Sequence, residues 1–74
     1  MIYCYKVDIE VSVPGKEPSM HQEYMRYITM EKPLEMVVKM DAVEQMKDKN
    51  GSRIPKSVLV ISEEEYLNHT KKQD

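Results

Sequence analysis

The chain has 74 residues, of which 13 are acidic and 11 are basic, so its formal net charge at pH 7 is -2. This length fits one small domain, because domains usually run to about 100–150 residues and rarely divide below that. No apolar run approaches the roughly 20 residues that span a bilayer, and we expect neither a membrane segment nor a secretion signal. The single cysteine, Cys4, excludes an internal disulfide and favours a reducing compartment, which we expect to be the cytoplasm.

The first predicted strand covers residues 5–13, where apolar and polar side chains alternate. The apolar set is Tyr5, Val7, Ile9, Val11 and Val13, and the polar set is Lys6, Asp8, Glu10 and Ser12. A period of two places the apolar set on one face, which we expect to be buried. Pro14-Gly15 then favours a type II turn, because Pro fixes φ at the first central position and Gly accepts a positive φ at the second.

A second strand is predicted over residues 23–30, where alternation is weaker but Tyr24, Tyr27 and Ile28 raise the β-propensity. Pro18 keeps the intervening segment open, so the two strands are expected to form a hairpin with a longer loop. Pro33 then either ends the strand or opens a helix, since proline is tolerated at the first helical position.

Residues 34–49 carry two competing patterns. Helical spacing links Met36, Met40, Val43 and Met46, and strand-like alternation links Leu34, Met36, Val38 and Met40. The first pattern predicts one long helix, with Lys47 and Lys49 in its last turn and Asn50-Gly51 as a left-handed cap. The second predicts a strand over 34–40 and a helix over 42–49. We favour the long helix, because the shorter one would have only about two turns.

The last predicted elements are a strand and a short helix. An unbroken apolar run comprises Val58, Leu59, Val60 and Ile61. Such a run is typical of a strand buried on both faces, and Pro55 before it is restricted to an edge or a strand start. Ser62 followed by Glu65 is a capping-box pattern that predicts a short helix through Leu67.

This order predicts an α+β fold of β-β-α-β type, with a three-stranded, mostly antiparallel sheet, one helix on one face and a short C-terminal helix. We expect a single domain over residues 1–69 and a flexible polar tail over 70–74. One helix covers one sheet face, yet the run 58–61 offers apolar side chains to both. Either the terminal helix folds back over the second face, or another copy or a partner protein covers it.

The residues that catalyse reactions or bind metals form no recognisable pattern in the sequence. Cys4, His21 and His69 lie far apart, whereas zinc needs three or four converging ligands. The acidic run 63–65 starts a predicted helix, where carboxylates favour the helix dipole, and two glycines are too few for a phosphate-binding loop. We therefore expect no enzyme activity, no catalytic or metal-binding residue, no cofactor and no small-molecule substrate.

A basic segment over residues 47–56 supports an alternative function. Lys47, Lys49, Arg53 and Lys56 are opposed there only by Asp48, and together they would form a positive patch for phosphates. The chain is acidic overall, however, and lysines also suit the solvated end of a helix. Nucleic-acid binding through this patch therefore stays an alternative.

Size, the lack of catalytic groups and the doubly apolar run 58–61 favour a non-catalytic protein-binding module, a regulator or inhibitor that covers a partner surface. Seven methionines and five tyrosines add the adaptable composition of protein interfaces. We expect the interface at Tyr24, Tyr27, Val58 and Val60. Small regulators of phages or mobile elements share this size and acidity, which is a loose analogy. The other alternative is a structural homodimer whose self-association completes the sheet.

Overall fold

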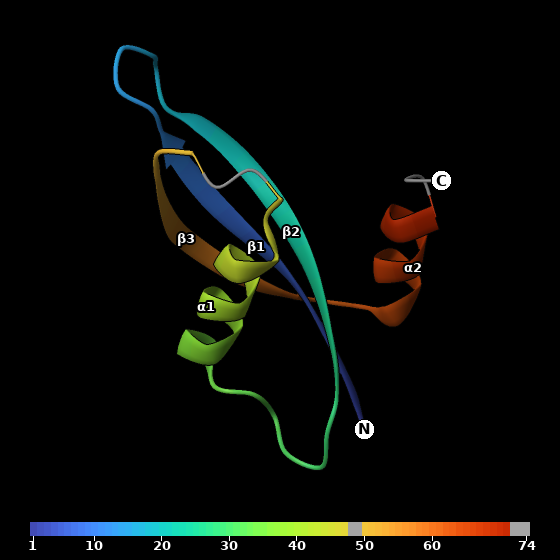
Figure 1. The fold of residues 1–74 in the computed structure, drawn as a ribbon. Helices are drawn as coiled ribbons and strands as arrows, with labels where there is room; N and C mark the ends of the chain where they lie inside the picture. The colour runs from blue at the N-terminus through green and yellow to red at the C-terminus, as the bar shows by residue number, and fades with distance from the viewer. Residues whose placement is uncertain (48–49, 72–74) are drawn as a thin grey trace.

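The computed structural model describes residues 1–47 and 50–71, and within them the chain forms three strands and two helices (Figure 1). The strands are β1 (Ile2–Ser12), β2 (Ser19–Ile28) and β3 (Ser52–Ile61), and the helices are α1 (Glu35–Gln45) and α2 (Glu63–Lys71). Their order is β-β-α-β-α, and all pairings in the sheet are antiparallel, so the predicted α+β fold is confirmed.

The strand β1 lies in the middle of the sheet, whose order is β2-β1-β3. Cys4 of β1 pairs with Arg26 of β2 and with Ile61 of β3, so these three side chains share one face of the sheet. The pairing of β1 with β3 shifts between Asp8 and Ile9, next to Pro55. Such an irregularity suits proline, because its ring nitrogen has no hydrogen to donate to a ladder.

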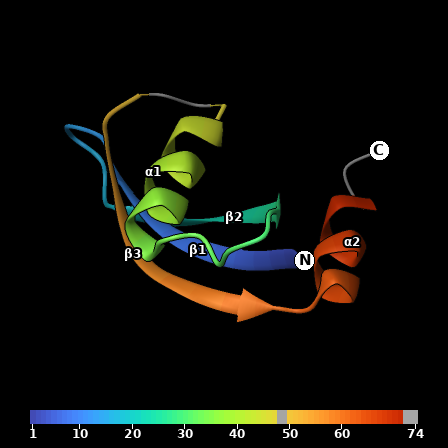
Figure 2. The same cartoon turned by 90° about the horizontal axis from the view of Figure 1, so that it is seen from below.

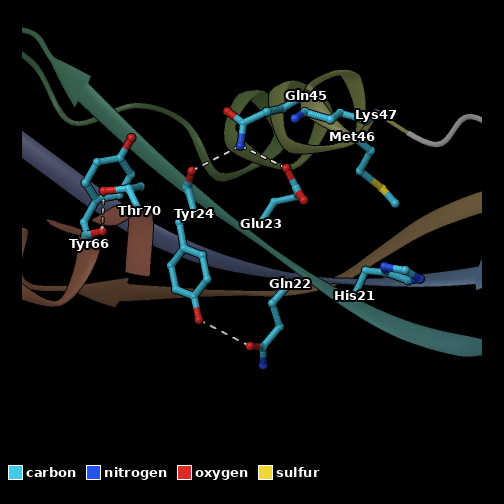
Figure 3. Close-up of a pocket in the computed structure, with 9 residues that line it drawn as sticks. All are labelled: His21, Gln22, Glu23, Tyr24, Gln45, Met46, Lys47, Tyr66 and Thr70. Carbon is cyan, nitrogen blue, oxygen red and sulfur yellow. Dashed lines mark hydrogen bonds between the residues drawn. The ribbon is translucent and has the colours of Figure 1, made fainter. Parts of the chain in front are cut away.

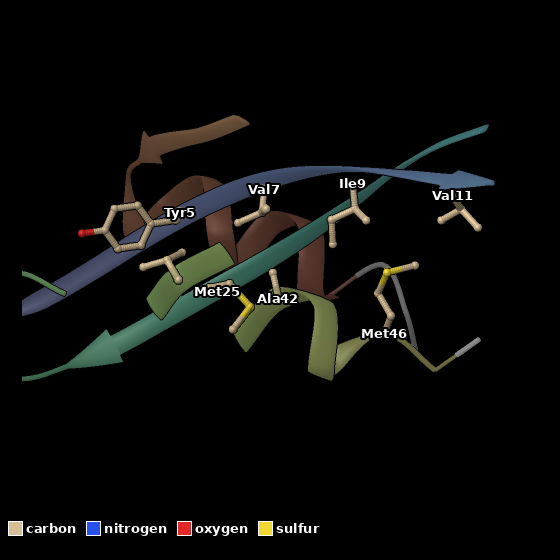
Figure 4. Packing of buried hydrophobic residues seen from close by; sticks show 8 residues of the cluster. Tyr5, Val7, Ile9, Val11, Met25, Ala42 and Met46 are labelled. Carbon is tan, nitrogen blue, oxygen red and sulfur yellow. The ribbon is translucent and has the colours of Figure 1, made fainter. Parts of the chain in front are cut away.

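The hydrophobic core lies between β1 and α1 (Figure 4). It comprises Tyr5, Val7, Ile9, Val11, Met25, Val38, Ala42 and Met46. Val7 and Ile9 alternate along β1 and are completely buried against α1, which confirms the predicted apolar face of the first strand. Burying each such side chain contributes about 1.5–3 kcal/mol to stability, so the strand with the strictest alternation carries much of the core.

The two strands of the β1–β2 hairpin are longer than predicted, and the turn between them is the expected one. The Lys16 N–H donates to the Val13 carbonyl oxygen at 3.0 Å, and Gly15 has a φ of 83°. These two features confirm the type II turn at Pro14-Gly15.

The helix α1 begins directly after Leu34, so the helical interpretation of residues 34–40 is confirmed and the strand alternative is wrong. It ends earlier than predicted, at Gln45, because Met46 turns to an extended ψ of 133° and buries its side chain in the core. The predicted cap is therefore wrong. Gly51 has a positive φ of 77°, but there it lets the backbone approach β1, where a Cβ atom would collide with the Ser12 carbonyl oxygen.

The two helices lie on opposite sides of the sheet (Figure 1), and α2 follows β3 after a short link (Figure 2). At the start of α2 the Glu65 N–H donates to the Ser62 hydroxyl at 3.1 Å, which confirms the predicted N-cap. Thr70 and Lys71 are the last residues of α2, and the rest of the predicted tail, 72–74, lies outside the described residues. Neither helix in the described ranges is long and apolar enough to cross a membrane.

The strand β3 lies at an edge of the sheet, so the expectation of a strand buried on both faces is wrong. Of the two coverings considered for the second face of the sheet, the terminal helix is the one observed. α2 folds back onto that face, but there it contacts β1 and β2. Val60 remains 69% exposed on one face of β3, and Leu59 remains 51% exposed on the other. β1 occupies the central position, and its alternating side chains point to two faces that are covered by different helices.

Candidate functional site

The first two turns of α1 carry exposed apolar side chains on the side that points away from the sheet, and the exposed Glu44 follows them on that side. We call Met36, Val37 and Met40 the outer α1 face; all three are exposed, Met36 at 70% and Met40 at 63%. Because α-helices have 3.6 residues per turn, these side chains lie opposite Val38 and Ala42, which are buried in the core. Over residues 36–42 α1 thus carries apolar side chains on two opposite sides, a pattern that a helix with only one covered side does not require.

Polar side chains border the outer α1 face. On one side the ammonium group of Lys39 lies 3.4 Å from the Glu35 carboxylate, one helical turn away. On the other side Asp41 accepts a hydrogen bond from Tyr27 of β2, and Gln45 donates one to Glu23 of β2. The apolar centre and polar border together resemble the layout of protein interfaces.

A shallow depression of about 130 Å³ lies between the start of α1 and β3. It is lined by Tyr5, Lys32, Pro33, Glu35, Val58 and Val60. The Tyr5 hydroxyl is buried and has no hydrogen-bond partner among the described residues. Burial is also the main cause that raises the pKa of the Tyr5 phenol, so this group stays a protonated donor at neutral pH.

A second, larger groove of about 760 Å³ follows β2 between the end of α1 and α2 (Figure 3). The Gln45 side-chain amide occupies part of it, donating to the Glu23 carboxylate at 2.9 Å and to the Tyr24 carbonyl oxygen at 3.2 Å. Gln45 therefore satisfies a backbone acceptor at the edge of β2 that a further strand would otherwise use.

The two tyrosines of the predicted interface lie on opposite faces of β2. The Tyr27 hydroxyl donates to Asp41 of α1 at 2.8 Å, whereas the Tyr24 ring stacks on His69 of α2 with 4.2 Å between ring centroids. Burial, followed by the hydrogen bond to Asp41, raises the pKa of Tyr27 well above its ordinary value. These contacts attach β2 to a helix on each side of the sheet.

The two valines of the predicted interface share the α1 face of β3, but they differ in burial. Val58 packs against the core, and Val60 is exposed at the depression. The outer α1 face was not predicted, because Met36 and Met40 fit a core-facing helical stripe equally well. The available signal was an excess: residues 36 and 40 and residues 38 and 42 are all apolar, more than one stripe needs.

The basic segment is only partly open to solvent. The Arg53 guanidinium donates to the Val43 carbonyl oxygen at 3.0 Å, and the Lys56 ammonium lies 3.1 Å from the Glu10 carboxylate. Lys47 is exposed after α1, and the predicted Lys49 lies outside the described residues. Two of the four basic side chains therefore bind groups of the chain itself.

The reactive side chains are also engaged in the fold. Cys4 is a buried free thiol, and its pKa is raised first by burial and then by the Glu63 carboxylate, against a lowering by Arg26. Arg26 itself lies 3.8 Å from Glu63 and 5.4 Å from the centre of the Tyr66 ring. In the described ranges no three His, Cys, Asp or Glu side chains gather in a way that could hold a metal ion.

Comparison with known proteins gave no match to any protein-family model, to any curated protein or to any solved structure.

Proposed function

We propose that this protein is a non-catalytic protein-binding module, a regulator or inhibitor that acts by covering a surface of its partner. The observation that carries the proposal is the outer α1 face. Exposed apolar patches with a polar border mark interaction sites in soluble proteins, and thioether side chains adapt their shape to a partner. The polar groups of the α1 border are held by contacts within the chain, so they keep the patch in place.

The spacing of the outer α1 face indicates how a partner would bind. Met36 and Met40 are four residues apart and Val37 lies beside them, which is the anchor spacing of a helix that lies in an apolar groove. Complete burial of one such methionine is worth about 1.5–3 kcal/mol. Two anchors therefore suffice to change the affinity for a partner by more than tenfold, since about 1.4 kcal/mol corresponds to a factor of ten.

Val60 and the depression beside it extend the apolar surface toward β3. Nucleic-acid binding through the basic segment has less support, because Arg53 and Lys56 already bind groups of the chain.

The test is a pull-down with the tagged chain from a lysate of its source, with and without nuclease, followed by mass spectrometry. The informative variant is Met36→Gln with Met40→Gln, because glutamine keeps the helix propensity of methionine and removes the apolar contact. The matched control is Met20→Gln, which makes the same change at another exposed methionine, on β2.

We expect the wild-type chain and the Met20→Gln control to recover the same protein near stoichiometrically, whether or not nuclease is present. The double variant should lose at least about tenfold in recovery and in affinity for the purified partner. Equal recovery by the double variant, or recovery that disappears with nuclease, would contradict the proposal.

A further inference from the structure

We infer that β3 is a self-association edge: it pairs antiparallel with β3 of a second copy and joins the two three-stranded sheets into one. This interface lies on the sheet edge and does not use the outer α1 face. It shares Val60 with the margin of the proposed partner surface, but the two proposals fail under different variants.

The exposed side chains of β3 show where the edge is open. Val60 points to the α1 face and Leu59 to the opposite face, and both are more than half exposed. Natural edge strands are usually protected by charged side chains, proline or irregular pairing. β3 has such protection only at its start, in Pro55, Lys56 and the register shift, whereas residues 57–61 carry no charge.

The apolar side chains of β3 indicate which kind of strand can pair with its free edge. A strand that pairs with residues 58–61 must offer apolar side chains on both faces of the extended sheet, because Val60 and Leu59 need cover on opposite faces. The segment 58–61 is itself such a strand. The strictly alternating β1 is already enclosed between two neighbours, and the corresponding part of β2 carries polar and charged residues.

The limits of the free edge define a register. Pro55 lacks a backbone donor, and α2 begins at Glu63, so pairing is confined to residues 56–62. The midpoint of this stretch is Leu59. A twofold axis at Leu59 pairs the entire stretch with its copy and sets Val58 opposite Val60 of the second copy, on the α1 face. Axes at neighbouring residues of the same face would shorten the paired stretch.

The charges at the two ends of β3 favour the antiparallel direction. The start of the strand carries Arg53, whose contact with the neutral Val43 carbonyl leaves its charge uncompensated among the described residues, and Lys56, which is paired with Glu10, whereas the residues that follow the strand, 63–65, are glutamates. Antiparallel pairing of two copies brings the basic start of one strand to the acidic end of the other, and parallel pairing would set like charges together. Exposed ion pairs are worth only about 0.2–1 kcal/mol each, so they orient the pairing, and the apolar residues supply the affinity.

The other edge of the sheet does not compete for this role. At the middle of β2 the Gln45 amide already binds the Tyr24 carbonyl oxygen, and Tyr24 stacks on His69. A second copy pairing there would have to displace these contacts.

The first test is sedimentation equilibrium of the wild-type chain from micromolar to submillimolar concentration, with circular dichroism to confirm folding. We expect a reversible dimer. Leu59→Lys places two like charges next to each other on the twofold axis and should weaken the dimer at least about tenfold. The control is Ile28→Lys, which makes the same type of change on the exposed end of β2 and should leave the dimer intact.

The second test reports the register and does not depend on a destabilising substitution. Leu59→Cys places the two introduced thiols on the axis, where opposing Cα atoms in an antiparallel pair are about 4.5–5.5 Å apart, within disulfide range. Oxidised glutathione should therefore link the chains. Ser57→Cys, whose two copies would be offset by roughly 13 Å along the strands, should not crosslink. The wild-type chain is a further control, since Cys4 is buried.

The inference is overturned by a wild-type chain that stays monomeric at every concentration. It is also overturned by a dimer that survives Leu59→Lys, by one that Ile28→Lys removes, or by crosslinking of Ser57→Cys in place of Leu59→Cys. Loss of the dimer in the Met36→Gln, Met40→Gln double variant would place self-association on the outer α1 face and would overturn the inference as well.

Discussion

The two edge strands, β2 and β3, flank the same central strand but differ in their contacts with the helices and in the exposure of their apolar side chains. β2 is fixed by side chains from both helices: Tyr27 and Gln45 link it to α1, and Tyr24 stacks on α2. β3 is attached to α1 by Arg53, which donates to a carbonyl oxygen of the helix at the start of the strand, and by Val58, which packs against the core. Farther along, β3 leaves Leu59 and Val60 exposed on its two faces.

The two edges of this small sheet therefore differ in how far the chain itself occupies them. At β2 the Gln45 amide binds the Tyr24 carbonyl oxygen, and Tyr24 and Tyr27 contact the two helices, so the middle of that edge is occupied within one chain. At β3 the apolar side chains have no counterpart on the described surface beside them, and their burial needs another strand. The following changes test this contrast, in order of decreasing expected effect.

Ile9→Ala should have the largest effect, because Ile9 is completely buried in β1 and supports both edges. Removal of a buried isoleucine side chain beyond Cβ costs about 2–5 kcal/mol, a large part of the stability of a domain of this size. Urea unfolding followed by circular dichroism measures it. Ile28→Ala, at an exposed position of β2, should change stability by less than about 0.5 kcal/mol. Equal losses in the two variants would contradict the placement of the core.

Tyr27→Phe should weaken the attachment of β2 to α1, because it leaves the Asp41 carboxylate without the hydroxyl donor. We expect a loss of about 1–2 kcal/mol at pH 7 in urea unfolding. The folded chain holds the Tyr27 proton more tightly than the unfolded chain, whose tyrosine pKa is near 10.0. The stabilisation is therefore complete below that pH and decreases as the pH rises through it toward the higher folded pKa.

The alkaline profile separates this effect from a general loss of packing. Wild-type stability should fall more steeply above pH 10 than that of Tyr27→Phe, whose remaining alkaline decrease includes the contribution of Tyr5, because burial raises the pKa of that phenol as well. Parallel profiles for the two proteins would contradict the assignment of the raised pKa to Tyr27.

Gln45→Glu should make the edge of β2 resemble the open edge of β3. The substitution keeps the side-chain shape but removes the amide donor to the Tyr24 carbonyl oxygen and sets a second carboxylate beside Glu23. We expect a loss of about 1 kcal/mol in unfolding free energy at pH 7. Gln45→Ala, which removes the donor without adding a charge, should lose less. A Gln45→Glu variant with unchanged unfolding free energy would show that the edge of β2 does not depend on this contact.

Val60→Lys should have the smallest effect on the monomer, within about 0.5 kcal/mol, because the side chain is exposed and lysine can extend into water. Val58→Lys is the matched variant on the same strand and the same face; it should destabilise the fold clearly, since Val58 packs against the core. Unfolding of both variants, measured at concentrations below dimer formation, checks the contrast. Similar stabilities would contradict the different burial of the two valines.

Three local features of the fold follow from the sequence alone. Alternation in residues 5–13 defined a strand with one buried face, Pro14-Gly15 defined its turn, and Ser62 with Glu65 defined the start of α2. Each of these signals depends on neighbouring residues alone: on side-chain period, on the backbone freedom of glycine and proline, or on a single N-cap hydrogen bond. These three signals agree with the tertiary contacts around them, whereas the local cap signal at Asn50-Gly51 failed because Met46 leaves the helix and buries its side chain in the core.

The tertiary structure alone decided which apolar side chains find cover. In the sequence, Met36 and Met40 are indistinguishable from core residues, and the run 58–61 resembles a buried strand. The fold leaves the two methionines, Leu59 and Val60 exposed, because β1 takes the centre of the sheet and α1 can turn only one of its sides toward it. Burial depends on the neighbours that an element receives, and those neighbours come from parts of the chain far away in sequence. The candidate surfaces of this protein exist for that reason.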